Sequence, residues 1–185
     1  MSSPLQKDYG GDAYLVKKLP GKFLIAVIDG LGHGRMAYEA ASRTLELLAS
    51  NDDSELHSLM ESMHEGLIGT VGVVLGLALI DYESQQITFA GIGNITIKLI
   101  GQKKTEVFLP AGILGYHTNF SYNKTITISP EDILLMHTDG ISDNYRLNSF
   151  SPLILSSPKE IVQTLMSGYR RTSDDALVLA ASELW

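Results

Sequence analysis

A long apolar run without alternating polar positions constrains the fold of this chain more than any other stretch. Residues 66–80 read GLIGTVGVVLGLALI. A membrane-spanning helix needs about 18 to 20 apolar residues, and this glycine-rich run is shorter. A strand that is covered on both faces loses the usual alternation of apolar and polar side chains. The run therefore predicts a buried central strand rather than a membrane span.

The elements predicted around this strand occur in blocks. Strands at 13–17 and 23–28 precede helices at 36–48 and 55–65, whose apolar residues recur at three- and four-residue spacings. Block order favours an α+β layered domain over a doubly wound parallel sheet. The remaining predictions are strands at 71–80, 86–90, 95–100, 105–109, 122–128, 133–136 and 176–181, a loop at 110–119 and a helix at 158–166.

Composition narrows the class of protein. The 185 residues are 44% hydrophobic, which suits a single domain over 1–185 with a sizeable core. The net charge of −7, without a strong basic cluster, argues against nucleic acid as a partner. The absence of cysteine excludes a disulfide framework and a thiolate zinc site. The N-terminal residues lack the apolar core of a signal peptide, so we expect a cytoplasmic protein without a membrane partner.

Acidic residues stand at the edges of several predicted strands. Asp12 opens a strand, Asp29 and Asp139 each close one, and Asp174 and Asp175 stand just before the last. Strand ends can converge, and bare carboxylates that lie close together repel one another. A hard divalent cation removes that penalty, and oxygen-only ligands favour Mg²⁺ or Mn²⁺ over zinc.

The segment IAVIDGLGHG at residues 25–34 has three possible explanations. A dinucleotide fingerprint fails because Arg35 stands where its third glycine is required. A single Asp-Gly pair is typical of a turn. Here, however, two separate apolar strands run straight into Asp-Gly, at Asp29 and at Asp139. We therefore predict that Asp29 is a metal ligand and that Gly30, lacking a Cβ, lets its carbonyl approach the ion.

Taken in order, seven segments resemble the metal-dependent (PPM-type) serine/threonine protein phosphatases, and most closely their SpoIIE-like branch. The similarity runs from about Asp8 to Ala181. Within the branch, GIGNITIKL and HTDGI are most similar to the RsbX group of stressosome phosphatases, which lack the N-terminal domains usual elsewhere in the branch. The seven segments are GGDAY, VIDGLGHG, GTVGVVLGLALID, FAGIGN, LPAGILG, LLMHTDGIS and SDDALVL.

The resemblance implies a four-layer αββα sandwich with two central, mainly antiparallel β-sheets. It also implies two Mn²⁺ or Mg²⁺ ions and a metal-activated water that attacks the phosphorus of phosphoserine or phosphothreonine. Asp29 would bridge the ions, and Asp29 and Asp139 are the expected catalytic residues. The implied metal ligands are Asp12, Asp29, the Gly30 carbonyl, Asp139 and Asp174, with Asp174 preferred to Asp175.

The implied partners are phosphorylated STAS-domain proteins of the stressosome, of the RsbS and RsbR kind. Two alternatives stay open. The substrate can instead be an anti-sigma-factor antagonist, as in other SpoIIE-like enzymes. The chain can also be a pseudophosphatase that binds a partner without turnover, although retention of the acids argues against this.

Several positions admit two interpretations. Leu31 stands where many relatives have the histidine thought to protonate the leaving group, and His33 either takes that part or is an exposed loop residue. His137 either supports the metal ligands or packs in the core. Arg35 is either a phosphate ligand or a solvated residue in the first helical turn. His57 and His64 are predicted at the surface, and His117 lies in the 110–119 loop that can border the site.

Overall fold

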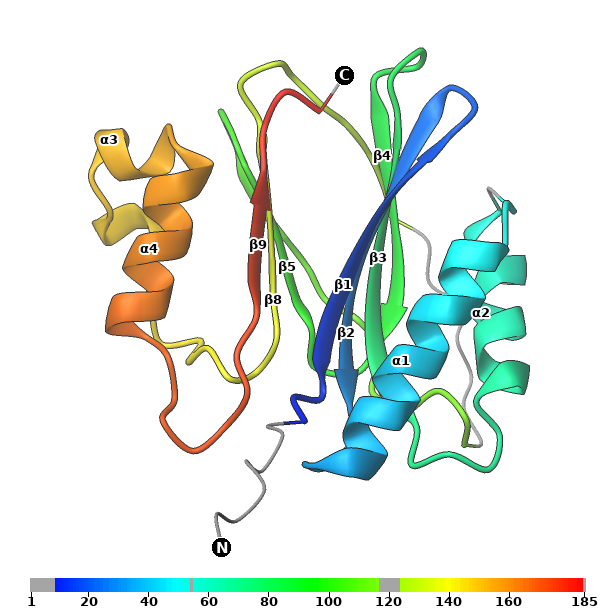
Figure 1. Cartoon of the computed structure of the whole chain (residues 1–185). Helices are drawn as coiled ribbons and strands as arrows, with labels where there is room; N and C mark the ends of the chain where they lie inside the picture. Colours follow the sequence, from blue (N-terminus) through cyan, green and yellow to red (C-terminus); the bar gives the residue numbers. More distant parts are fainter. Residues whose placement is uncertain (1–8, 54, 117–123, 185) are drawn as a thin grey trace, which may run out of the picture.

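The chain forms two β-sheets packed face to face, with helices on the outer face of each sheet (Figure 1). The computed structural model describes residues 9–53, 55–116 and 124–184. The strands are β1 (Asp12–Leu19), β2 (Lys22–Gly30), β3 (Val73–Asp81), β4 (Gln86–Ile92), β5 (Thr96–Ile100), β6 (Lys104–Val107), β7 (Lys124–Thr127), β8 (Ile133–His137) and β9 (Val178–Ala181). The helices are α1 (Arg35–Ser50), α2 (Leu56–Gly66), α3 (Pro152–Leu155) and α4 (Pro158–Gly168), with a 3₁₀ turn at Leu147–Ser149.

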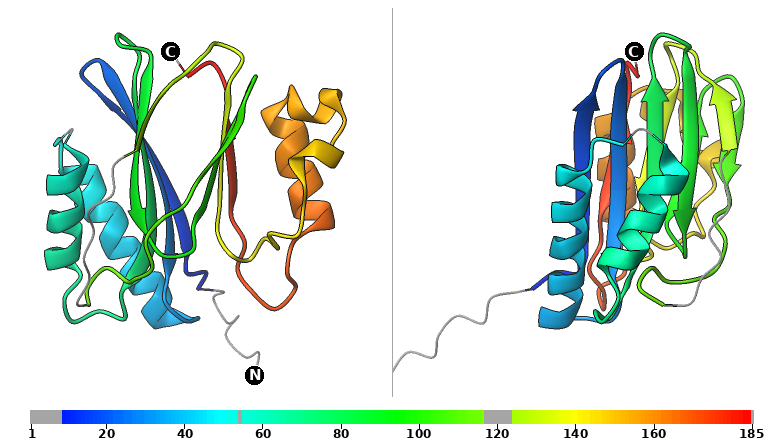
Figure 2. Two further views of the ribbon diagram at one scale, coloured as in Figure 1. Left: turned by 180° about the vertical axis from the view of Figure 1, so that it is seen from behind. Right: turned by 90° about the vertical axis from the view of Figure 1, so that its right-hand side faces the viewer.

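The first sheet has the strand order β1-β2-β3-β4-β7 and the second has the order β6-β5-β8-β9. Every pair of neighbouring strands is antiparallel. Helices α1 and α2 cover the first sheet, and α3 and α4 cover the second (Figure 2). The predicted four-layer αββα sandwich of the α+β class is therefore confirmed.

Strand β3 is the buried central strand that the apolar run predicts. Its residues from Val73 to Ile80 are all buried between β2 and β4. A Cβ at Gly76 would lie 2.8 Å from the side chain of Ile95 and 3.2 Å from that of Met136, both in the second sheet's half of the molecule. The glycine therefore allows the two sheets to approach closely at their centre.

Helix α1 packs through small side chains. Its buried residues follow the predicted three- and four-residue spacings and form a stripe, with Leu45 half-buried at its edge: Ala37, Ala40, Ala41, Thr44 and Leu48. Small residues bring the helix axis close to β1 and β2. The buried residues of α2 are Leu56, Leu59, Met60 and Met63, at the three- and four-residue spacings from which the helix is predicted.

Some element boundaries differ from those predicted. The strand predicted from residue 71 begins at Val73, because Gly72 has a φ of +81° and cannot continue an extended strand. The 3₁₀ turn and α3 were not predicted. The strand predicted at 122–128 is described from Lys124 and forms β7. No helix in the described part of the chain is both long and apolar enough to cross a membrane.

Candidate metal centre

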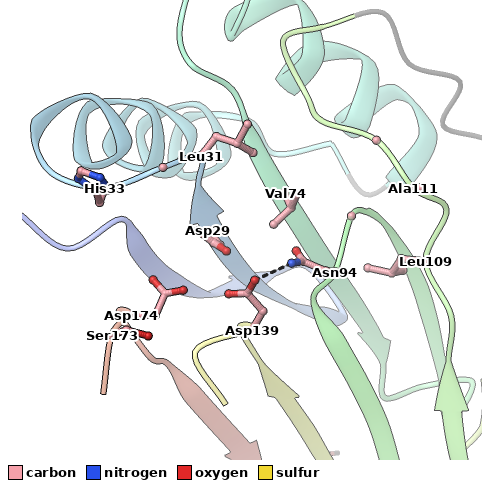
Figure 3. A pocket seen from close by; sticks show the side chains of 13 residues that line it. Asp29, Leu31, His33, Val74, Asn94, Leu109, Ala111, Asp139, Ser173 and Asp174 are labelled. Atoms are coloured by element: carbon pink, nitrogen blue, oxygen red, sulfur yellow. Dashed lines mark hydrogen bonds between the residues drawn. The ribbon is translucent and has the colours of Figure 1, made fainter. Parts of the chain in front are cut away.

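The strand ends bring acids from both sheets to one end of the sandwich. In the antiparallel pairing of β1 with β2, Asp12 lies directly opposite Asp29. Asp139 follows β8, and Asp174 lies in the segment that leads into β9. Asp29, Asp139 and Asp174 point into the same cleft (Figure 3).

This cleft has a volume of about 710 Å³ and opens to solvent. Besides the three acids, it is lined by His33, Asn94 and Ser173 on its polar side. Asp12 and Gly30 are not among the lining residues; Asp12 pairs with Asp29 across β1 and β2, and Gly30 follows Asp29 in β2. Three of the five predicted metal ligands therefore share one cavity, and the other two adjoin it.

Thr138 fixes the position of Asp12. Its hydroxyl donates to Asp12 Oδ2 at 2.6 Å and accepts from the Leu177 N–H at 3.0 Å. The Thr138 N–H in turn donates to the Leu177 carbonyl at 3.1 Å. Because Thr138 is fully buried, it rigidly joins β1 of the first sheet to the end of β8 and the start of β9.

Asn94 orients Asp139. The Asn94 side-chain amide, in the turn between β4 and β5, donates to Asp139 Oδ2 at 2.8 Å (Figure 3). A bond to one carboxylate oxygen leaves the other oxygen directed into the cleft. The sequence pattern did not identify Asn94 or Thr138 as site residues, although each is a polar residue at the end of an apolar strand.

Asp174 and Asp175 have different surroundings. Asp174 lines the cleft, whereas Asp175 Oδ2 accepts a hydrogen bond of 2.7 Å from the Gly11 N–H. Asp175 therefore holds the segment that precedes Asp12. This division is consistent with the preference for Asp174 as a ligand, which stays a prediction.

Gly30 and Gly140, the glycines of the two Asp-Gly pairs, both permit close packing. A Cβ at Gly30 would collide with the backbone carbonyl of Ala37 in α1, and one at Gly140 would collide with the Asp175 carbonyl. The Gly30 N–H also donates to the Gly11 carbonyl at 3.0 Å. Close approach of neighbouring backbone is thus a reason for glycine that the sequence did not predict. The role of the Gly30 carbonyl as a ligand stays a prediction.

Two of the acids, Asp29 and Asp12, have a raised pKa. Burial, followed by the charges of the other acids, raises the pKa of Asp29 to about 7. Burial also raises the pKa of Asp12 to about 6; the Thr138 hydrogen bond opposes this rise, and the charges of Asp175, Asp174 and Asp139 add to it. A cation at this position would offset the repulsion and restore the ionised forms.

The donor chemistry fits a hard divalent cation. The acids offer only oxygen atoms, which suits Mg²⁺ or Mn²⁺. Among the residues that the structure describes, no group of three or more acidic or histidine side chains is already arranged to bind a metal ion. The fit therefore rests on the all-oxygen donor set and on the raised pKa of Asp29 and Asp12, and the ligand set stays a prediction.

The histidines and Arg35 have distinct environments. His33 lines the cleft. His137 is fully buried, with Nδ1 2.8 Å from the Thr138 carbonyl oxygen and Nε2 2.8 Å from the Tyr145 hydroxyl, and burial lowers its pKa. Arg35 is paired with Glu39 at 2.6 Å and its side chain is 77% exposed, which agrees with a solvated first-turn residue.

Two surface predictions and one loop prediction concern the remaining histidines. His57 is exposed, as predicted, and lies 3.4 Å from Glu61. His64 is half-buried and accepts a hydrogen bond of 3.3 Å from the Gly115 N–H, so it is only partly exposed at the surface. His117 lies outside the described residues.

Comparisons with known proteins identify the family of this chain. The family model for stage II sporulation protein E (SpoIIE) matches residues 20–182. The chain is 25% identical to phosphoserine phosphatase RsbX of Bacillus subtilis (strain 168) over 139 residues. This match covers 74% of this chain and 69% of RsbX.

Two solved structures have similar folds. A chain from a structure of the bacterial stressosome, described as a modular system adapted to control secondary messenger signalling, is 28% identical with a TM-score of 0.80, covering 92% of this chain and 90% of that one. RsbX in complex with magnesium is 23% identical with a TM-score of 0.77, covering 95% and 88%. At 23% identity, the second likeness shows a shared fold.

Proposed function

This chain belongs to the SpoIIE family of serine/threonine protein phosphatases, and we propose that it acts on phosphorylated STAS-domain proteins of a bacterial stressosome in the cytoplasm. The observation that carries the chemistry is that three carboxylates from separate strand ends, Asp29, Asp139 and Asp174, line one open cleft. Similarity to RsbX and to a chain from a stressosome structure supports the choice of substrate.

We assign Asp12, Asp29, the Gly30 carbonyl, Asp139 and Asp174 as the residues that would hold two Mg²⁺ or Mn²⁺ ions. When bound, such ions supply a water of lowered pKa and positive charge for the phosphoryl oxygens. The raised pKa of Asp29 supports this assignment, because it indicates a carboxylate that lacks a compensating charge. The magnesium complex of the similar RsbX supports the choice of ion.

The remaining site residues position these acids. Thr138 occupies Oδ2 of Asp12 and leaves Oδ1 available, and Asn94 holds Asp139 through Oδ2 in the same way. His33 lies on the cleft wall, where its ring can donate a proton to the leaving serine or threonine oxygen. The cleft is open, so that a phosphorylated segment of another protein can enter it.

The first test is phosphate release from a small aryl phosphate, with and without Mn²⁺. We expect turnover that requires Mn²⁺ and that Asp29→Asn reduces to near background. Asp81→Asn is the matched control, because Asp81 lies at the opposite end of the same sheet and pairs with Lys22. Turnover that ignores both Mn²⁺ and Asp29→Asn would contradict the proposed centre.

The second test compares protein substrates. We expect faster phosphate release from a phosphorylated stressosome STAS-domain protein than from a phosphorylated anti-sigma-factor antagonist. Equal rates, or the reverse order, would refute the stressosome assignment and favour the alternative substrate. Binding of the phosphoprotein to the Mn²⁺-loaded chain without release of phosphate would instead indicate a pseudophosphatase.

A further inference from the structure

The cleft has an apolar half that the phosphatase chemistry does not use. We call the side chains of Leu31, Val74, Leu109 and Ala111 the apolar shelf; all four line the same cavity as the acids. Figure 3 shows them on one side of the cleft, with Asp174 and Ser173 on the other. The apolar shelf is therefore adjacent to the position where a phosphoryl group would bind.

Backbone hydrogen bonds hold the segments of the apolar shelf in place. The Leu31 N–H donates to the Gly72 carbonyl at 3.0 Å, and the Gly93 N–H donates to the Pro110 carbonyl at 2.8 Å. Beyond the shelf, Leu114 and Val73 exchange two backbone hydrogen bonds of 2.9 and 3.3 Å. A surface that is already ordered loses little conformational entropy when a ligand binds.

Glycines leave the wall of the cleft bare. Gly32, Gly93 and Gly112 all line the cavity, and all have positive φ values of 85°, 93° and 151°. At Gly93, a Cβ would also collide with the side chain of Val74. The absence of side chains at these positions gives a peptide backbone room to lie along the wall.

Charge determines which peptide side chains the apolar shelf accepts. The described residues that line the cleft include three carboxylates but no lysine or arginine. An acidic side chain placed on the apolar shelf would find no lysine or arginine on the cleft wall to pair with, and it would lose hydration without gaining a hydrogen bond. An apolar side chain would instead remove apolar surface from water on both sides of the contact.

We propose that the apolar shelf selects phosphorylation sites in which a large apolar residue directly precedes or follows the phosphoserine or phosphothreonine. This inference rests on the proposed phosphatase function and names the class of sequence that the same site takes. Under it, Leu31, Leu109 and Ala111 determine specificity, while the acids perform the chemistry.

The test uses two sets of phosphoserine peptides. In one set the residue before the phosphoserine is Leu, Ala, Lys or Glu, and in the other set the residue after it is varied in the same way. We expect kcat/KM to be about tenfold or more higher for Leu than for Ala at one of the two positions, and lowest for Glu. A small aryl phosphate is assayed in parallel. Turnover of the aryl ester without a preference among the peptides overturns the shelf alone, whereas no turnover of any substrate overturns the proposed function.

A charge introduced into the apolar shelf should reverse the preference. Ala111 is exposed, so Ala111→Lys adds a cation without removing core volume. We expect the ratio of kcat/KM for the Glu peptide over the Leu peptide to rise by about tenfold or more. Leu153→Lys is the matched control, because Leu153 is 76% exposed on α3 and away from the cleft; it should leave the ratio unchanged.

A binding measurement separates recognition from turnover. With Asp29→Asn in the background, fluorescence anisotropy of labelled peptides should give the same order of Kd values, with Leu tightest and Glu weakest. The additional Ala111→Lys change should reverse this order. An unchanged order of both Kd and kcat/KM in the lysine variant would show that Ala111 does not contact the peptide and would overturn the proposal.

Discussion

At the scale of single residues, Thr138 links more of the site than any acid does. One hydroxyl joins Asp12 to the Leu177 N–H, so it connects residues that lie 126 and 39 positions away in the sequence. Such a residue gives no periodic signal. Its partner is decided by the packing of one sheet on the other.

We expect Thr138→Val, which preserves shape and removes the hydroxyl, to reduce both stability and metal affinity. The Leu177 N–H would lose its partner in a partly buried position, at a cost of about 1–3 kcal/mol. Loss of the bond to Asp12 should weaken Mg²⁺ binding by about 10- to 100-fold, as is typical when the partner of a metal ligand is removed. Urea unfolding and calorimetric titration with Mg²⁺ measure the two effects.

Thr138→Ser is the control, because serine keeps the hydroxyl and loses one methyl group. It should retain most of the Mg²⁺ affinity. If valine and serine weaken Mg²⁺ binding equally, the hydroxyl does not position Asp12.

Among the site residues, the acids could be predicted and their partners could not. Asp29 and Asp139 each follow an apolar strand and precede a glycine, which is a local pattern. Asn94 donates to Asp139 across 45 positions of sequence, and nothing near Asn94 indicates that distance. The sequence also predicted glycine after Asp29 for a metal-related reason, whereas the structure adds a packing reason from α1.

At the scale of elements, the best-predicted parts are those whose burial follows a simple rule along the chain. Strand β3 agrees with the sequence prediction because its burial is continuous, and α1 and α2 agree because their buried residues recur at three- and four-residue spacings. The 3₁₀ turn and α3 are too short for such a repeat. They depend on Tyr145 and Phe150, which stack with ring centroids 6.1 Å apart in the core between the second sheet and its helices.

The contact between α1 and the end of β2 provides the prediction at this scale. Gly30→Ala places a Cβ against the Ala37 carbonyl, where only backbone can yield. We expect destabilisation of about 1–3 kcal/mol, as for other overpacked positions, together with weaker Mn²⁺-dependent turnover because Asp29 shifts with β2. Thermal unfolding and the aryl phosphate assay measure these changes.

Gly168→Ala is the matched control for this substitution. Gly168 ends α4, and a Cβ there meets no atom within 4 Å. Alanine should be neutral or stabilising by about 0.5–1 kcal/mol. Equal effects at Gly30 and Gly168 would show that the close packing of α1 on β2 is not what requires glycine.

At the scale of the whole molecule, the acids couple the two sheets. Asp12 and Asp29 belong to β1 and β2 of the first sheet, and Asp139 and Asp174 flank β8 and β9 of the second. Without an ion, this coupling is repulsive, because the charges of the other acids add to burial, the larger cause, in raising the pKa of Asp29 and of Asp12. An ion held by both pairs would convert the same contact into a cross-link between the sheets.

The contribution of these acids to the free energy of unfolding should therefore fall with rising pH in the metal-free protein and rise with rising pH when metal is bound. In the metal-free protein, the pKa of Asp29 is about 7 and that of Asp12 about 6, both above the unfolded value of about 3.9. Between about pH 3.9 and pH 7, the folded state thus binds more protons than the unfolded state. The contribution of these two groups is fully present below about pH 3.9 and is lost as pH rises through 6 and 7.

Mg²⁺ competes with those protons, so it should raise the melting temperature more at pH 8 than at pH 5. At a concentration 100 times Kd, binding adds about 2.7 kcal/mol to the free energy of unfolding. Melting curves with Mg²⁺ and with a chelator, at both pH values, measure this difference. In Asp29→Asn, the melting temperature of the metal-free protein should depend less on pH, and Mg²⁺ should raise it less. Asp81→Asn should keep both the pH dependence and the Mg²⁺ effect, because Asp81 lies at the far end of the sheet. The pKa of Asp81 is lowered by hydrogen bonds from the Ser84 and Glu83 N–H groups. A Mg²⁺ effect that is equal at pH 5 and pH 8 in the unaltered protein would mean that the ion does not displace protons from these carboxylates, and that the two sheets are not joined through them.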